Sequence, residues 1–221
     1  MVIDAVCEVS GAEMMVPAEV MSHHEADHRV ANSLHLVSAL LGFQARQSVN
    51  PEVRDALAAA INRIFAVAGI HRQLCQSDSS DVVDIASYFV DLASALEQGC
   101  GGGVAQKRVL VHVKRQMVPA AFASAMGIVI TELVMNACKH AYGPDEPGTV
   151  EVRIFFPTPT DFQMEVRDYG GPTALRPPVC PGIGTRIIDV MSRKLNAVYA
   201  YVPDEEGTRF LMQGAVASRH S

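Results

Sequence analysis

The chain has 221 residues, of which 49% are hydrophobic, so it can bury a sizeable core in one large domain or two small ones. Its 18 basic and 24 acidic residues give a net charge of −6 and form no basic block, which argues against nucleic acid as the main partner. No apolar run approaches the roughly 20 residues of a membrane span, and the start lacks the basic residues of a signal peptide, so we expect a cytoplasmic protein without membrane insertion.

The first third of the chain predicts a helical hairpin. Residues 1–21 show no clear period and form an N-terminal extension. From Ser22 to about Ser48 a long helix is expected, with an apolar seam at Val30, Leu34, Val37 and Leu41. Pro51 favours the first turn of a second helix to about Gln76, with a matching face at Val53, Leu57, Ile61, Ile64, Val67 and Ala68. A hairpin alone leaves its seam half exposed, so we expect a homodimer that forms a four-helix bundle.

The rest of the chain mixes helices and strands. A helix is expected over Val82–Leu96, a flexible break at Gly99–Gly103, and a long helix over Ala120–Ala141. A second short helix is expected over Gly182–Leu195, and the expected strands are Val109–Val113, Thr149–Phe156, Phe162–Asp168, Ala197–Val202 and Arg209–Gln213. This order indicates an α+β layered domain.

The five cysteines are scattered and show no Cys-x-x-Cys spacing: Cys7, Cys75, Cys100, Cys138 and Cys180. An odd, scattered set indicates neither a disulfide framework nor a zinc site. We therefore expect reduced and mostly buried thiols.

The long helix over Ala120–Ala141 carries the first candidate site. Glu132, Asn136, Lys139 and His140 follow one stripe of a helix that is otherwise almost entirely apolar. Because unpaired polar groups on a buried helix are costly, something polar should lie against them. From this stretch alone, a satisfied core network or a solvent-facing edge is as good an explanation as a ligand site.

Three glycine-containing features follow it. Asp168 and Gly170 end a strand, where an aspartate can accept a hydrogen bond from an amino group. Gly182 and Gly184 open a helix, whose free N–H groups favour phosphates. Thr208 starts the last strand, where its hydroxyl could reach a phosphate. Each feature alone is more often a turn or a helix start, and their order and spacing carry the functional signal.

In that order, these motifs resemble the N box (Glu132-x-x-x-Asn136-Ala-x-Lys139-His140), the G1 box (Asp168-x-Gly170) and the G2 box (Gly182-x-Gly184) of the GHKL-type ATP-binding domain of histidine kinases. The run from His28-Arg29-Val30-x-Asn32 to Gln44-Ala45-Arg46 resembles the phosphoacceptor box of the HisKA_2 subclass, a close relative of the HWE kinases. Further matches lie at Asn62-Arg63-Ile64, His71-Arg72-Gln73-Leu74 and Asp84-Ile85-Ala86. The implied domains are a dimerisation and phosphoacceptor hairpin (22–78) and a GHKL-type α/β sandwich that binds ATP (79–221).

The resemblance implies a role for each matched residue. In the hairpin, His28 is the phosphoacceptor, Arg29 neutralises phosphate charge, and Asn32 orients a water for dephosphorylation of a partner. In the ATP-binding domain, Asn136 is a ligand of Mg²⁺ and Glu132 takes the imidazole proton or holds a metal-bound water. The remaining implied nucleotide contacts are Lys139, His140, Asp168, Gly170, Gly182, Gly184 and Thr208.

Five departures from the family pattern concern the site and the input signal. The lid between Gly171 and Gly182 is short and rich in proline. The G1 box reads Asp-Tyr-Gly-Gly-Pro rather than the fuller Asp-x-Gly-x-Gly. Arg29 stands where many kinases have an acid, so the general base remains open among Glu25, Asp27 and Glu132. The chain has no tryptophan, which excludes the tryptophan motif of strict HWE kinases. Too few residues precede the hairpin for an ordinary sensory domain, so we expect a separate sensor protein, a fragment or a relay.

Several functions therefore remain open. The favoured one is an ATP-dependent histidine kinase that phosphorylates His28 and passes the phosphoryl group to a response regulator receiver domain. A histidine phosphotransferase with a degenerate ATP site is the first alternative, and a response regulator phosphatase that depends on Asn32 is the second. A serine-type kinase or ATPase on the same fold would leave the hairpin unexplained.

Overall fold

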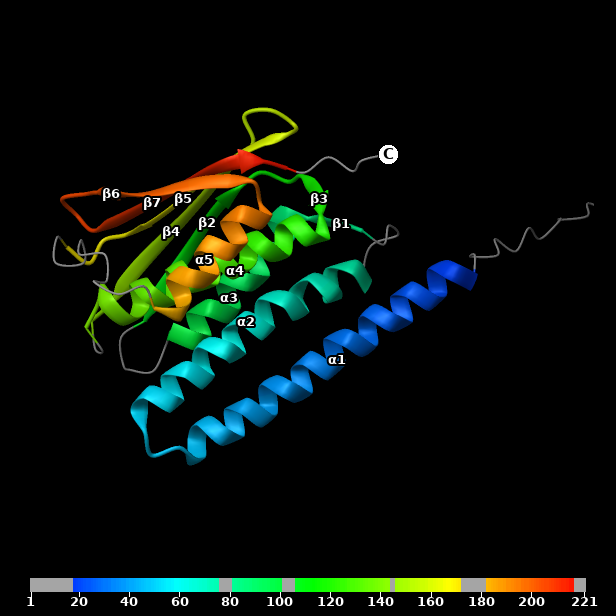
Figure 1. Cartoon of the computed structure of the whole chain (residues 1–221), viewed down its shortest axis with the longest axis horizontal. Coiled ribbons are helices and arrows are strands. Elements are labelled where there is room, and N and C mark those ends of the chain that lie inside the picture. The colour runs from blue at the N-terminus through cyan, green and yellow to red at the C-terminus, as the bar shows by residue number, and fades with distance from the viewer. Residues whose placement is uncertain (1–17, 76–80, 101–105, 144–145, 172–181, 217–221) are drawn as a thin grey trace, which may run out of the picture.

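The computed structural model describes residues 18–75, 81–100, 106–143, 146–171 and 182–216, which form five helices and seven strands (Figure 1). The helices are α1 (Ala18–Gln47), α2 (Pro51–Cys75), α3 (Ile85–Cys100), α4 (Ala120–His140) and α5 (Ile183–Lys194). The strands are β1 (Val82–Asp84), β2 (Lys107–Val113), β3 (Met117–Pro119), β4 (Gly148–Phe155), β5 (Asp161–Asp168), β6 (Ala197–Pro203) and β7 (Thr208–Ala215). The expected N-terminal extension falls almost wholly outside the described residues.

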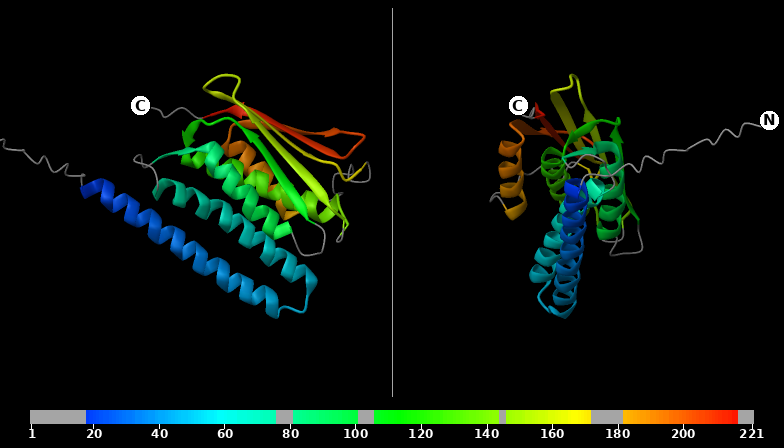
Figure 2. Two further views of the ribbon diagram at one scale, coloured as in Figure 1. Left: turned by 180° about the vertical axis from the view of Figure 1, so that it is seen from behind. Right: turned by 90° about the vertical axis from the view of Figure 1, so that its right-hand side faces the viewer.

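A mixed five-stranded sheet carries the second part of the chain. Its strand order is β2-β4-β5-β7-β6, in which β2 and β4 are parallel and the other pairs antiparallel. Helices α3, α4 and α5 cover one face of the sheet (Figure 1). The α1–α2 hairpin lies beyond these helices, with α2 against α3 and α4 and with α1 outermost (Figure 2).

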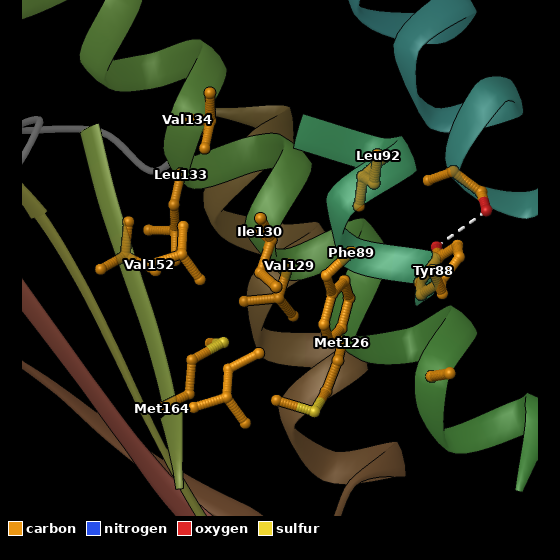
Figure 3. Packing of buried hydrophobic residues seen from close by; sticks show 14 of the residues in the cluster. Tyr88, Phe89, Leu92, Met126, Val129, Ile130, Leu133, Val134, Val152 and Met164 are labelled. Carbon is orange, nitrogen blue, oxygen red and sulfur yellow. Dashed lines mark hydrogen bonds between the residues drawn. The ribbon is translucent and has the colours of Figure 1, made fainter. Parts of the chain in front are cut away.

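The strands show the alternation that a half-covered sheet requires. In β5, Phe162, Met164 and Val166 point to the helices, whereas Gln163 and Glu165 point away from them. The core consists of these inward residues and the apolar sides of the helices, as the packing of Phe89, Met126 and Ile130 shows (Figure 3). By length and composition α4 could cross a membrane, contrary to the sequence-based expectation, but 72% of its apolar window is buried in this core.

The second half of α2 belongs to the same core. Ala66, Ile70 and Leu74 are buried in the main hydrophobic cluster. The hydroxyl of Tyr88, on α3, donates a hydrogen bond of 2.8 Å to the Ala66 carbonyl (Figure 3). Gly69 leaves room for this ring, because a Cβ there would lie 3.0 Å from the Tyr88 Cε2 atom. The hairpin is therefore joined to the sheet domain through a packed interface.

The predicted seam of α1 is half exposed in the hairpin, as expected, with Leu34 and Leu41 half-buried. Ala31 and Ser38 are buried against α2, whereas Val30 and Val37 are 39% and 43% exposed. On α2, Val53 is also exposed. Small residues let the two helices approach closely, so the apolar residues beside them remain on the outer side of α1. This outer face consists of Val30, Leu36, Val37, Leu40 and Phe43.

Two other expectations need correction. The segment from Val82 begins as strand β1, which pairs with the unpredicted β3, and α3 starts only at Ile85 because the Asp84 carboxylate accepts the backbone N–H of Ala86 at 3.1 Å. Cys100 and Cys138 form a disulfide with Cα atoms 5.9 Å apart, so these two thiols are not reduced. Spacing along the sequence gave no sign of this pair because it joins the end of α3 to the end of α4.

Candidate functional site

The polar stripe of α4 is present as expected, but its members differ in exposure. Glu132 is buried at 5% exposure, whereas Asn136, Lys139 and His140 are exposed. Successive members are three or four residues apart or adjacent, so they follow one side of the helix toward its C-terminal end. The stripe combines a carboxylate, an amide and two basic groups in the last three turns of α4.

Helix α2 of the hairpin covers two members of this stripe. The guanidinium of Arg63 donates to both Glu132 oxygens, with Nε–Oε1 2.5 Å and Nη2–Oε2 2.9 Å. Lys139 Nζ lies 2.5 Å from Asp55 Oδ2. Between these pairs, the Asn62 amide contacts the Met135 sulfur at 3.0 Å. The sequence alone allowed either a satisfied polar network or a ligand site at this stripe. For Glu132 and Lys139, the structure shows a polar network with side chains of α2.

Arg63 and Asp55 are site residues that sequence reasoning missed. Arg63 lies within the family match Asn62-Arg63-Ile64, which is the one signal that could have drawn attention to it. The helical period shows that a residue is on a given face but does not show which helix that face meets.

The N box and the G2 box meet at the start of α5. A Cβ at Gly184 would lie 2.8 Å from Glu132 Oε2 and within 3.9 Å of the Asn136 amide atoms, so the absence of a side chain at Gly184 leaves room for the Glu132 carboxylate. Gly182 precedes the helix. Among the described residues, no side chain caps this helix end and no atom lies within 4 Å of the position that a Cβ of Gly182 would take. The exposed Asn136 amide thus lies beside an uncapped helix N-terminus, which favours anions.

The G1 box and Thr208 meet at the other side of the α4 terminus. Asp168 is buried, and its Oδ1 accepts the N–H groups of Gly170 at 3.2 Å and of Thr208 at 3.1 Å. A side chain at Gly170 would clash with the Ala141 carbonyl, and one at Gly207 would clash with Asp168. The structure therefore brings Asp168, Gly170 and Thr208 together, but the contact of Thr208 is through its backbone and not its hydroxyl.

The predicted phosphoacceptor, His28, lies toward the open end of the hairpin, away from the loop that joins α1 to α2. The backbone of His28 is helical in α1, and its side chain lies outside the described residues, as do those of Glu25 and Asp27. Arg29 and Asn32 are exposed on α1. Two turns after His28, the His35 ring lies 3.0 Å from Arg72, so the antiparallel register places His28 beside the last residues of α2. At a rise of 1.5 Å per residue, this is about 18 Å along the hairpin from Arg63.

A further polar network occupies the sheet face away from the helices. Glu151 accepts hydrogen bonds from Tyr169 at 2.9 Å and Arg153 at 2.8 Å and lies 2.9 Å from His112 Nε2. Burial alone raises the pKa of Glu151, but the hydrogen bonds from Tyr169 and Arg153 and the nearby positive charges outweigh it, so the pKa lies below its ordinary value. Burial raises the pKa of Tyr169. A cavity of about 670 Å³ adjoins this network, and none of the predicted site residues lines it.

The residues around Asn136 suit a magnesium nucleotide. The Asn136 amide supplies an oxygen of the kind Mg²⁺ prefers, and the uncapped α5 start faces the same place. Among the described residues there is no cluster of three or more His, Cys, Asp or Glu side chains that could hold a metal by itself, so such an ion would share its ligands with phosphates. The lid between Gly171 and Gly182 lies outside the described residues.

Two family models match the chain in tandem. The HisKA_2 model, described as "Histidine kinase", matches residues 25–100. The HATPase_c_2 model, described as "Histidine kinase-like ATPase domain", matches residues 104–196. The first match covers most of α1 together with α2 and α3, and the second covers the chain from β2 through α5.

The curated relatives are sensor histidine kinases. PdtaS of Mycobacterium tuberculosis (strain H37Rv) is 33% identical over 155 residues, which is 67% of this chain and 29% of that protein. PdtaS of Mycolicibacterium smegmatis is 31% identical over 149 residues, covering 67% of this chain and 30% of that protein. The chain therefore spans less than a third of the length of these relatives.

One solved structure shows the same fold over most of the chain. The histidine kinase domain of the blue-light-activated histidine kinase EL346 of Erythrobacter litoralis superposes with a TM-score of 0.63 at 22% identity. The match covers 90% of this chain and 95% of that one. It confirms the predicted α+β class, in which N-terminal helices precede a GHKL-like α/β domain.

Proposed function

The chain belongs to the histidine kinase family, in its HisKA_2 subclass, and from that premise we propose that it is an ATP-dependent kinase that phosphorylates His28 and passes the phosphoryl group to an aspartate of a response regulator receiver domain. The observation that carries the proposal is the meeting of Glu132 and Asn136 of α4 with Gly184 of α5. These residues come from two motifs some 50 residues apart in sequence. Their contact places the amide oxygen of Asn136 beside the N-terminus of α5, and both groups suit the phosphates of a single magnesium nucleotide.

The nucleotide end of the reaction depends on this group of residues. Asn136 would hold Mg²⁺, which would neutralise charge on the nucleotide phosphates. The backbone N–H groups at Gly182 and Gly184 would bind phosphate oxygens, together with Lys139 and His140. Asp168 would accept the adenine amino proton with the carboxylate that Gly170 and Thr208 hold in place.

The transfer step moves the γ-phosphoryl group from the nucleotide site in the sheet domain to His28 in the hairpin. A neutral imidazole nitrogen of His28 attacks the γ-phosphorus, the bond from phosphorus to the bridging oxygen breaks, and ADP leaves. Glu132 is the described carboxylate that could take the imidazole proton, once it is free of Arg63. Arg29 would offset phosphate charge near His28, and Asn32, one turn further, would orient a water molecule for dephosphorylation of the partner receiver domain.

We further propose that two copies pair through the outer face of α1. This face consists of exposed apolar side chains: Val30, Leu36, Val37, Leu40 and Phe43. Such a continuous apolar strip on one helix is costly in water. A four-helix bundle made from two hairpins would bury it, in a cytoplasmic homodimer.

Incubation with γ-labelled ATP and Mg²⁺, followed by addition of receiver domains, tests the proposed function. The expected result is an acid-labile label on the kinase that moves to a receiver domain. The variant His28→Gln should lose the label, and the matched variant His24→Gln should retain it. A folded protein that takes up no label from ATP would contradict the kinase function.

The alternative that a specific observation favours is a histidine phosphotransferase. Glu132 and Lys139, two of the N-box side chains, are engaged by α2 rather than directed at a nucleotide. A relay would show no heat on calorimetric titration with an ATP analogue and Mg²⁺, yet it would accept label from a phosphorylated receiver domain. A kinase gives heat in the first experiment.

A further inference from the structure

Tyr142 lies between α4 and the G1 box but belongs to none of the motifs named above. It follows the last residue of α4 by two positions, and its ring is buried in the main hydrophobic cluster. Its hydroxyl donates a hydrogen bond of 2.5 Å to the Thr149 carbonyl in β4 and accepts one of 2.8 Å from the backbone N–H of Tyr169. Tyr169 directly follows Asp168, the last residue of β5. One phenol therefore connects the end of α4, the start of β4 and the G1 box.

Two glycines allow the chain to come this close to Tyr142 and the end of α4. A Cβ at Gly148 would lie 2.5 Å from the Tyr142 Cδ2 atom, and a Cβ at Gly170 would overlap the Ala141 carbonyl. Both positions therefore need a residue without a side chain. The backbone of the G1 box thus rests directly on the residues that follow α4.

The orientation of the Asp168 carboxylate depends on this backbone. Its Oδ1 accepts the N–H groups of Gly170 at 3.2 Å and of Thr208 at 3.1 Å. The N–H that Tyr142 accepts belongs to Tyr169, which lies between Asp168 and Gly170 in the chain. The hydroxyl of Tyr142 therefore fixes the same segment that carries and orients the carboxylate.

The Tyr142 hydroxyl can make both hydrogen bonds at neutral pH. Burial raises its pKa above the ordinary value of 10, although its hydrogen bonds with Tyr169 and Thr149 act in the opposite direction. A protonated phenol donates one hydrogen bond and can accept another, as this one does. Phenylalanine would fill the same space and make neither bond, so Tyr142→Phe removes the connection and keeps the packed ring.

We propose that Tyr142 is a positioning residue for base recognition: its hydroxyl holds the G1 box so that the Asp168 carboxylate meets the 6-amino group of adenine. The inference rests on the function proposed above and deepens it, because it names a residue that sets the base specificity of the same site. A base with a 6-oxo group presents an acceptor in place of the amino donor, and a fixed carboxylate repels it. A carboxylate that is free to shift discriminates less between the two bases.

The contact itself can be tested without nucleotide. The chain has five tyrosines, so labelling with [15N]tyrosine gives at most five amide signals, which single-tyrosine variants assign. Hydrogen exchange at the Tyr169 amide should become about tenfold faster or more in Tyr142→Phe, because the amide loses its acceptor. Tyr88→Phe is the matched control, since it removes another buried phenol that donates to a backbone carbonyl. It should leave the Tyr169 amide at the wild-type rate. Equal rates in the wild type and Tyr142→Phe would overturn the contact.

The base specificity is measured by calorimetric titration with ADP and Mg²⁺ and with inosine diphosphate and Mg²⁺, in which hypoxanthine replaces adenine. We expect the wild type to bind ADP about tenfold more tightly or better, and Tyr142→Phe to lower this ratio about threefold or more. Tyr88→Phe should keep the ratio, because lost stability alone weakens the binding of both nucleotides equally.

The outcomes separate the positioning role from the kinase function. Equal affinities of the wild type for the two nucleotides, an unchanged ratio in Tyr142→Phe, or the same change in Tyr88→Phe would overturn the positioning role and leave the kinase function standing. No heat with ADP from any of the three proteins would overturn the kinase function, and the positioning role with it.

Discussion

Arg63 of α2 and Glu132 of α4 form a two-point ion pair between the hairpin and the sheet domain. The Glu132 side chain is 7% exposed and that of Arg63 is 24% exposed, so the pair lies at the edge of the core. Both carboxylate oxygens accept from the guanidinium, which fixes the two helices in one register. The Glu132 carboxylate, which was predicted to act at the nucleotide site, is thus held by α2, the second helix of the hairpin that carries His28.

Removal of Arg63 should destabilise the protein more than loss of a surface charge does. Arg63→Gln leaves the buried Glu132 carboxylate without its cation, and we expect a loss of about 2 kcal/mol in the free energy of unfolding. Urea unfolding followed by circular dichroism measures it. Arg54→Gln should change stability by less than about 0.5 kcal/mol. Equal losses for the two variants would mean that the pair contributes nothing to stability.

Gly127 should tolerate no side chain, because Tyr88 fills the space beside it. A Cβ at this position would overlap the Tyr88 hydroxyl, so Gly127→Ala must displace the ring and break its bond to Ala66. The expected cost is about 2 kcal/mol. Gly42→Ala serves as the control, because its Cβ meets only ordinary contacts and a helical alanine should stabilise by about 0.5 kcal/mol or more. Partial rescue of Gly127→Ala by Tyr88→Phe would confirm the cause, and thermal melts of the four proteins decide it.

Cys100 and Cys138 should be found linked in protein kept under oxidising conditions. The bond closes a segment with a sequence separation of 38 residues. Loop-closure entropy assigns such a bond about 4 kcal/mol. Peptide mapping without reductant should recover the linked pair, and reductant should lower the urea midpoint. The double variant Cys100→Ser with Cys138→Ser should be insensitive to reductant, whereas Cys7→Ser should behave as the wild type. A free-thiol count that includes both cysteines in the oxidised protein would show the prediction to be wrong.

Glu151 should make stability depend on pH in the acid range. Its pKa in the folded protein lies below the ordinary value of 4.5, so its ionised form stabilises the fold above that pH. This stabilisation is lost as the pH falls through the lower folded pKa. Thermal melts should therefore show Glu151→Gln less stable than the wild type at pH 7, with a difference that shrinks below about pH 4.5. Glu205→Gln, at an exposed position, should give no such pattern.

The elements were predictable where one pattern dominated. The long apolar α4 and the alternating strands β4 and β5 have periods that local sequence determines. The two short strands β1 and β3 were missed, because three residues carry no period and their pairing joins segments more than 30 residues apart. The burial of Ala31 and Ser38 against α2 was not predicted, because such small residues do not stand out in an apolar period.

The site was predictable as a set of motifs but not as a set of contacts. The sequence indicated that something polar should lie against the α4 stripe, and for Glu132 and Lys139 the described structure supplies Arg63 and Asp55. Which helix supplies those partners depends on tertiary packing, and so does the Cys100–Cys138 bond. The roles assigned to His28, Asn136 and the other motif residues remain predictions.

The most direct test of the account is the site of phosphorylation. After incubation with ATP and Mg²⁺ at neutral or higher pH, mass spectrometry that preserves phosphohistidine should place the phosphoryl group on His28 in the wild type. Asn136→Ala should lose that signal while keeping its circular dichroism spectrum, because Mg²⁺ and the nucleotide phosphates lose their oxygen ligand. A phosphoryl group on another residue, or an unchanged His28 signal in Asn136→Ala, would contradict the account.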